Sequence, residues 1–167
     1  MGIIGRILQT HKLSTVAVFN KFESFVEAVA EGVHNFETAT ITLALFTNAT
    51  PPAATDTNLA AVKISATEVP TANGYDQGAR PTLAGKTSGQ ASGTYTLGGD
   101  DITVTASGGS IADIRYFVLF NDSAAGDEVI GWYDYSEGSG NGAGGFTLLD
   151  GESVTLQFDV SGILTIA

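Results

Sequence analysis

The densest apolar segment of the chain, residues 111–135, predicts two strands joined by a polar loop at residues 121–128. Side chains of a strand point alternately to opposite faces of the sheet. The first strand is therefore expected to be largely apolar on both faces. One face should carry Ile114, Tyr116, Val118 and Phe120, and the other Arg115, Phe117 and Leu119. Such a strand is typical of the middle of a sheet that is covered on both sides.

Residues 129–135 are expected to return as the second strand of this hairpin. Strict alternation would place Ile130 and Trp132 on one face, and Val129, Tyr133 and Tyr135 on the other. The single Trp and three of the five Tyr of the chain lie within residues 111–135. We therefore expect the rest of the domain to pack around this hairpin.

Residues 18–33 predict one amphipathic helix. Its apolar positions follow the i, i+3, i+4 spacing of a helix face, and Phe25 and Ala28 widen the stripe formed by Phe19, Phe22, Val26, Val29 and Val33. Gly32 is a signal for the end of the helix. Packing of this face against a sheet is the default expectation. Use of the three Phe side chains to bind a partner is the alternative.

The remaining segments predict short strands separated by turns. Residues 38–47 alternate clearly, with Ile41, Leu43 and Leu45 on one face. Further strands are expected at residues 59–64, 93–97, 101–106, 146–149, 154–160 and 163–166. The dipeptide Asn73-Gly74 indicates a tight turn. The expected fold is mainly β, a β-sandwich or jelly-roll-like barrel of about eight to ten strands with one N-terminal helix and an extended N-terminal arm.

The arm is the predicted segment of residues 1–15, and residues 16–167 form the predicted single domain. Residues 1–15 contain no acidic residue, although the chain as a whole has a net charge of −11. We hypothesise that the apolar and basic side chains of the arm contact a neighbouring subunit; these are Ile3, Ile4, Arg6, Ile7, Leu8 and Lys12. A frayed chain end is the alternative.

Composition excludes several classes of function. The net charge of −11 argues against a nucleic-acid partner, since phosphate binding needs a cluster of Lys and Arg. The absence of Cys excludes disulfides and thiolate chemistry. No apolar run reaches the roughly 18 residues of a membrane-spanning helix, so no membrane association is expected. A cleaved signal peptide and N-terminal lipidation are not expected either.

Acidic loops are the first candidates for a metal site, because Ca²⁺ prefers oxygen ligands. The candidates are Asp100, Asp101, Asn121, Asp122, Asp127 and Glu128. Their spacing does not match a calcium-binding loop, so we expect solvated acids and no metal site. No Ser lies in a G-x-S-x-G motif, and neither His11 nor His34 is placed as a general base. We therefore expect a protein without enzymatic activity and without a cofactor.

Aromatic residues suggest a lectin-like binding platform as a rival function. The residues concerned are Tyr75, Tyr95, Trp132, Tyr133 and Tyr135. The alternative is that Trp132 belongs to the core and that the Tyr side chains lie at the sheet edges. We prefer this alternative, because a fold alone does not establish a function.

Several blocks of the sequence, taken in order, resemble the small virion structural proteins of tailed bacteriophages. The blocks are FNKFESFVEAVAEGVHNF (19–36), TITLALFTNATPP (40–52), NGYDQG (73–78), GGSIADIRYFVLFND (108–122), IGWYDY (130–135), LLDGESVTLQFD (148–159) and GILTIA (162–167). The similarity extends from about Phe19 to Ala167. Residues 1–15 fall outside the pattern.

The resemblance implies a non-enzymatic virion protein. A capsid decoration or cement protein on the outside of the capsid is the first expectation, with the major capsid protein as its partner. Capsid symmetry favours a homotrimer. The alternative is a tail, head-fibre or adaptor protein, with host-glycan binding as an added role. A hydrolase is the third and least favoured class.

Overall fold

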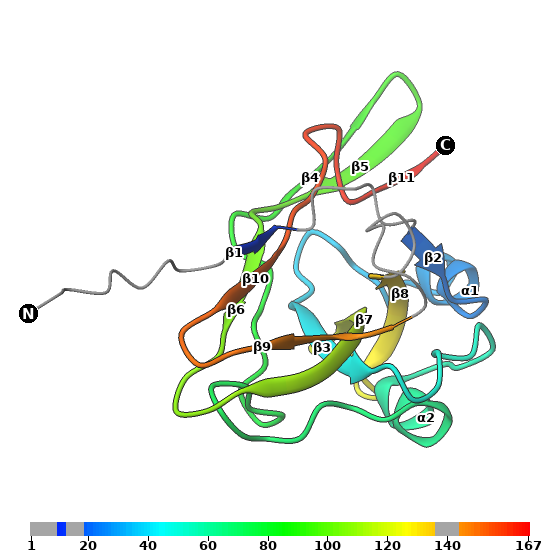
Figure 1. Ribbon diagram of the computed structural model, residues 1–167. Coiled ribbons are helices and arrows are strands. Elements are labelled where there is room, and N and C mark those ends of the chain that lie inside the picture. Colours follow the sequence, from blue (N-terminus) through cyan, green and yellow to red (C-terminus); the bar gives the residue numbers. More distant parts are fainter. Residues whose placement is uncertain (1–9, 13–18, 136–143) are drawn as a thin grey trace, which may run out of the picture.

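The computed structural model describes residues 10–12, 19–135 and 144–167, and this part of the chain is mainly β (Figure 1). Its elements, in chain order, are β1 (Thr10–Lys12), β2 (Phe19–Lys21), α1 (Phe25–Ala30), β3 (Ile41–Thr47), α2 (Leu59–Ser65), β4 (Thr87–Ala91), β5 (Thr94–Gly98), β6 (Ile102–Thr105), β7 (Ile111–Asn121), β8 (Glu128–Asp134), β9 (Phe146–Leu148), β10 (Ser153–Leu156) and β11 (Leu164–Ile166).

The largest sheet has the order β2-β8-β7-β3, and β9 also pairs with β7. All of its pairings are antiparallel. The 11-residue strand β7 lies inside the sheet, as the apolar pattern of residues 111–121 predicts. Two smaller sheets have the orders β1-β10-β6 and β11-β5-β4.

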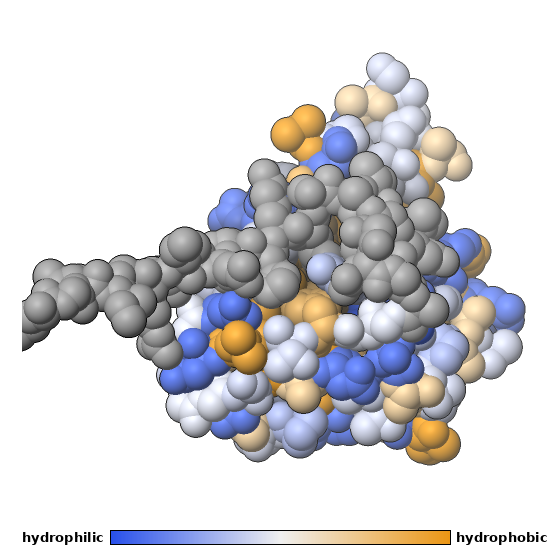
Figure 2. Space-filling view, in the orientation of Figure 1, coloured by the Kyte–Doolittle hydropathy of each residue, from blue (hydrophilic) through white to orange (hydrophobic). Residues whose placement is uncertain are grey.

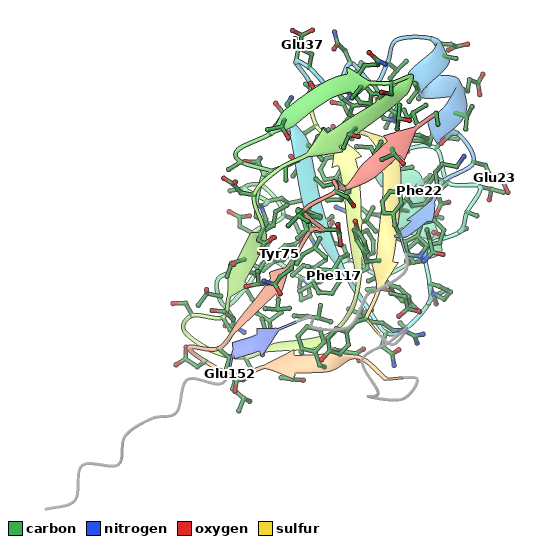
Figure 3. The ribbon with its side chains drawn as sticks, turned by 90° about the horizontal axis from the view of Figure 1, so that it is seen from above. Phe22, Glu23, Glu37, Tyr75, Phe117 and Glu152 are labelled. Atoms are coloured by element: carbon green, nitrogen blue, oxygen red, sulfur yellow. The ribbon has the colours of Figure 1, made fainter. Side chains whose placement is uncertain are left out.

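Each face of the largest sheet carries its own apolar cluster. On one face, Leu43, Phe117 and Leu119 pack with residues of the two smaller sheets, such as Leu97 and Val154. On the other face, the clustered residues are Phe22, Phe46, Leu59, Val62, Val118 and Phe120. Figure 3 shows Phe117 and Tyr75 inside the molecule. The prediction of a strand that is covered on both sides is confirmed.

Two β-bulges change the predicted faces of the central hairpin. Phe46 pairs with Tyr116 and Thr47 with Ile114, so Arg115 is an extra residue in β7. Ile114 therefore joins the cluster of Phe117, and its predicted face is wrong.

The second bulge lies between β7 and β8. Leu119 pairs with Gly131 and Phe120 with Val129, so Ile130 is the extra residue. Ile130 then belongs to the same cluster as Tyr133, while Trp132 packs against the cluster that contains Val129. The predicted pairing of Ile130 with Trp132 on one face is wrong for this reason.

The predicted helix at residues 18–33 is wrong in its extent. Phe19–Lys21 form β2, where Asn20 pairs with Trp132 of β8, and only Phe25–Ala30 are helical. The edge of β8 satisfies the backbone of β2, which outweighs the local helical pattern. The predicted stripe is buried only in part: Phe25 and Ala28 are buried, whereas Val26 is 55% exposed.

Residues 59–64 are helical rather than extended. Helix α2 starts after Asn58, whose side-chain Oδ1 accepts a hydrogen bond from the backbone N–H of Ala61 at 2.9 Å. This is a regular N-cap, and the i, i+3 pair Leu59 and Val62 is buried. The cap and this spacing are the signals that the prediction of a strand overlooked.

Most of the predicted arm lies outside the described residues, including Ile3, Ile4, Arg6, Ile7 and Leu8. The described part is β1, which pairs in parallel with β10 and ends with Lys12 opposite Thr155. The backbone of residues 10–12 thus lies on a sheet of its own chain. Contact of the arm with a neighbouring subunit stays a prediction.

Candidate binding surface

The β4–β5 hairpin stands out from the body of the molecule (Figure 1). Its two-residue turn consists of Ser92 and Gly93, with φ angles of 51° and 87°. Two successive positive φ angles define the turn type that matches the twist of a hairpin. All five residues of β4 are exposed, and Lys86 anchors the base of the hairpin by donating a hydrogen bond to the carbonyl of Ala39. The protrusion is mostly of intermediate hydropathy (Figure 2).

A groove of about 630 Å³ runs between this hairpin and the segment that follows α1. Glu37 lies beside the hairpin in Figure 3. The groove brings together three distant parts of the chain, and its lining includes Val29, Asn35, Phe36, Gln90, Tyr95 and Ile166. The lining combines apolar side chains with amide and carboxylate groups at the rim.

Stacked rings connect the groove to the core. The His34 and Phe36 ring centroids are 5.6 Å apart with an interplanar angle of 19°. Phe36 in turn stacks on Tyr95 at 6.3 Å. The rings of His34 and Phe36 are buried, so the ring of Tyr95 is the more accessible aromatic surface of the groove. The stack holds Tyr95 against the rigid body of the domain.

His34 is a buried titratable group of this stack. Its Nε2 lies 3.3 Å from the carbonyl oxygen of Val129. Burial lowers the pKa of His34, and the hydrogen bond to Val129 and the charge of Glu128 only partly offset this effect. We therefore expect a neutral ring at pH 7, which suits packing between Phe25 and Phe36.

A buried ion-pair network lies beside β3, the last strand in the order β2-β8-β7-β3, where Glu68 forms a β-bridge with Phe46. The Glu68 carboxylate accepts hydrogen bonds from Arg80 Nε at 2.6 Å and Nη2 at 2.9 Å, and Lys63 Nζ is 2.9 Å away. The Tyr75 hydroxyl donates to Glu68 at 2.8 Å and accepts from the Leu45 N–H at 3.0 Å. This network ties α2 and the loop after it to β3.

Burial alone would raise the pKa of Glu68. The hydrogen bonds and charges of Arg80, Lys63 and Tyr75 outweigh burial, and the pKa of Glu68 is lowered. Burial and the neighbouring Glu68 charge also raise the pKa of Tyr75. All of these groups are used to hold the fold together.

A second charged pair joins the two central strands. Arg115 donates to both carboxylate oxygens of Asp134 at 2.9 Å, and its Nη1 donates to Asn48 Oδ1 at 2.7 Å. Arg115 is the extra residue of the bulge in β7, and bidentate pairing with a carboxylate is the strong form of a charge-assisted hydrogen bond.

The structure does not bring the predicted aromatic platform together. Tyr75 and Tyr133 belong to the core, and Trp132 packs on Phe22 with ring centroids 4.6 Å apart. Tyr135 packs on Phe146 at 4.3 Å. Tyr95 is the member of the set that lines the groove. Residue 93, expected to begin a strand, lies in the Ser92-Gly93 turn instead. The sequence predictions used neither this Ser-Gly pair nor the run without acidic residues at 77–99, and neither signal points to an apolar lining.

The predicted acidic candidates are used in loop structure. The Asn121 side chain donates to the Val33 carbonyl at 3.0 Å, and the Asp101 carboxylate accepts from the Phe158 N–H at 2.9 Å. Burial and the charge of Asp122 raise the pKa of Asp127. Within the described ranges, no group of three His, Asp or Glu side chains is arranged to hold a metal ion.

Comparison of the chain with protein families, curated proteins and solved structures finds no match. Among the described residues, no helix is both long enough and apolar enough to cross a membrane.

Proposed function

We propose that the chain is a non-enzymatic structural protein of a tailed-bacteriophage virion, and that it decorates the outside of the assembled capsid. Its partner in this proposal is the major capsid protein. The sequence blocks that resemble small virion proteins motivate the proposal. The observation that carries it is the position of β1 at the outer edge of the sheet β1-β10-β6. Residues 1–9, which contain most of the predicted contact residues, directly precede this strand in the sequence.

The fold supports this proposal at the level of architecture. We infer a β-sandwich, in which the two small sheets together cover one face of the largest sheet. Buried charges such as Glu68 and Asp134 are engaged in hydrogen bonds within the fold. A rigid domain of this kind contributes surface to an assembly without changing its own shape.

The proposed benefit to the shell is thermodynamic linkage. A protein that binds only the assembled shell stabilises the shell by mass action. The free energy of stabilisation grows with the logarithm of the ratio between the free protein concentration and Kd. Extra interfaces then oppose the internal pressure of the packaged genome.

Sedimentation with assembled shells, and separately with tails, tests the proposal. We expect saturable binding to shells by the full chain, and at least tenfold weaker binding after deletion of residues 2–8. This deletion removes the predicted contacts Ile3, Ile4, Arg6, Ile7 and Leu8 but leaves β1 in place. The matched control is Ile64→Ser, which removes an isoleucine that is 89% exposed on α2 and should leave binding unchanged. Binding to tails alone, or to neither particle, would contradict the proposal.

The groove favours a second candidate function, that of a tail, head-fibre or adaptor protein that binds a host glycan. Sugars stack on accessible aromatic rings and hydrogen-bond to amides and carboxylates, and Tyr95, Asn35 and Glu37 line the groove together. A glycan array with the full chain and with Tyr95→Ala tests this function. A signal that disappears in the variant supports it, and an array without signal contradicts it.

A further inference from the structure

We infer that two copies of this chain associate through β4, which pairs antiparallel with β4 of the second copy around a two-fold axis at Gly89. In the part of the chain that the structure describes, β4 is the last strand of the sheet β11-β5-β4, and no strand pairs with its outer edge. The inference goes beyond shell binding, because it concerns contacts between copies of the chain itself.

The register of the hairpin identifies which backbone groups of β4 are free to pair. Ala91 pairs with Thr94 across the two-residue turn, so these residues exchange backbone hydrogen bonds. Bonded and non-bonded pairs alternate in an antiparallel ladder, so Gly89 is bonded to β5, whereas Ser88 and Gln90 are not.

A contact on the far side of β5 supports this assignment. The carbonyl of Leu97, the partner of Ser88, accepts a hydrogen bond from the Ile163 N–H at 2.7 Å. Leu97 thus directs its backbone toward β11. The N–H and C=O groups of Ser88 and Gln90 therefore point to the open edge of β4.

This edge is complementary to itself. In an antiparallel pair centred on Gly89, Ser88 of one copy faces Gln90 of the other, and both residues have their backbone groups directed at the partner. The pair forms four backbone hydrogen bonds and joins the two three-stranded sheets into one. Gly89 faces Gly89 of the second copy at the close, non-bonded position, where Cα atoms are about 4.5 Å apart.

The edge also lacks the features that keep strands apart. Natural proteins protect open edges with charged residues, proline or bulges, and β4 has the sequence TSGQA. All five residues of β4 are exposed, and Ser88, Gly89 and Gln90 also line the groove that contains Asn35 and Glu37.

The charge of the hairpin permits a second copy as the partner. The chain has a net charge of −11, and two copies repel wherever their acidic surfaces meet. Residues 77–99 contain Arg80 and Lys86 and no acidic residue. The hairpin itself therefore brings no carboxylate to the contact, and Glu37, which lines the groove with Ser88, Gly89 and Gln90, is the carboxylate beside it (Figure 3).

Charge-swap variants at Gly89 test the contact and its register in purified full-length protein. A Cβ atom at Gly89 meets no atom within 4 Å, and its φ is not in the left-handed region, so substitution should leave the fold intact. By sedimentation velocity, we expect concentration-dependent dimers of the wild type and of the control Gly89→Ala. Gly89→Lys alone and Gly89→Glu alone should each weaken the dimer by about fivefold, because like charges then face each other across the axis.

An equimolar mixture of Gly89→Lys and Gly89→Glu should restore dimers, since opposite charges then face each other. Gln90→Pro should abolish dimers, because it removes an outward N–H that β5 does not use. A monomeric or trimeric wild type, or a mixture that associates no better than its components, would overturn the inference. These measurements use no shells, so their failure is distinct from a failure of shell binding.

Discussion

Glu68 is a carboxylate whose side chain is 2% exposed, and three neighbouring groups compensate its burial. We predict that Glu68→Ala lowers the free energy of unfolding by about 3 kcal/mol at pH 7, because Arg80 and Lys63 lose their buried partner. Chemical denaturation measures this change. Glu37→Ala, which removes an exposed carboxylate, is the matched control and should change stability by less than about 0.5 kcal/mol.

The Glu68 effect has a defined pH dependence. The folded-state pKa is lowered, so the stabilisation is fully present above the ordinary value of 4.5 and is lost as pH falls through the folded-state pKa. The stability difference between wild type and Glu68→Ala should therefore shrink in acid. A difference that is constant from neutral pH into acid would contradict the ionised state of Glu68.

His34 has the opposite chemistry, because burial disfavours its charged form. Well above pH 6.5 the ring is neutral in both states, and as pH falls through 6.5 the unfolded chain binds a proton that the folded chain resists. We predict that stability falls from pH 6.5 downward to about pH 5, the range in which histidine titrates. In His34→Gln this part of the dependence should disappear, whereas it should persist in His11→Gln, which replaces the other histidine. Thermal unfolding across this range measures both.

The predicted tight turn at Asn73-Gly74 is confirmed, whereas the turn at Ser92-Gly93 was not predicted, because residue 93 was expected to begin a strand. Asn73-Gly74 and Ser92-Gly93 both have positive φ angles at both positions. A Cβ atom at Gly74 would lie 2.4 Å from the Thr105 carbonyl oxygen, whereas at Gly93 it would meet nothing within 4 Å. Gly74 is therefore required for two reasons: its own turn needs a positive φ angle, and the end of β6 lies too close to leave room for a side chain.

We predict that Gly93→Ala costs about 1 kcal/mol through backbone strain alone. Gly74→Ala should cost clearly more, because the Thr105 backbone must also move. The denaturant midpoints of the two variants measure these losses. The comparison is direct because Gly74 and Gly93 have similar positive φ angles, so the strain from an added side chain is similar at both. Equal losses would show that the contact of Gly74 with β6 carries no energetic weight.

Alternation along the chain was sufficient to predict β3, β6 and the central position of β7. It failed where a bulge adds one residue, since Arg115 and Ile130 each shift the following faces without any local signal. It failed again at Phe19–Lys21, whose conformation depends on the distant edge of β8.

The candidate surface was harder to predict than the core. Strand β4 contains no large apolar residue, so no periodic pattern marks it, and only its pairing with β5 makes it a strand. The groove is assembled from residues 29–37, 88–95 and Ile166. Segments so far apart in the chain are brought together by the tertiary structure, and Tyr95 was the one lining residue that the aromatic pattern had suggested.

At the scale of the whole molecule, the two proposals use different parts of the surface. The arm is proposed to contact the shell, and the edge of β4 is proposed to join two copies. The homotrimer expected from capsid symmetry and the two-fold pair inferred from β4 are different assemblies with different masses. Sedimentation of the purified chain separates them.

The central claim is that the protein stabilises an assembled capsid, and heating shells with increasing amounts of the full chain tests it most directly. Linkage predicts that the temperature of shell disruption rises with the concentration of free protein. Above Kd, the rise should grow with the logarithm of that concentration. The variant that lacks residues 2–8 should shift the temperature only at higher concentrations. A disruption temperature that is unchanged at saturating protein would contradict the proposed function.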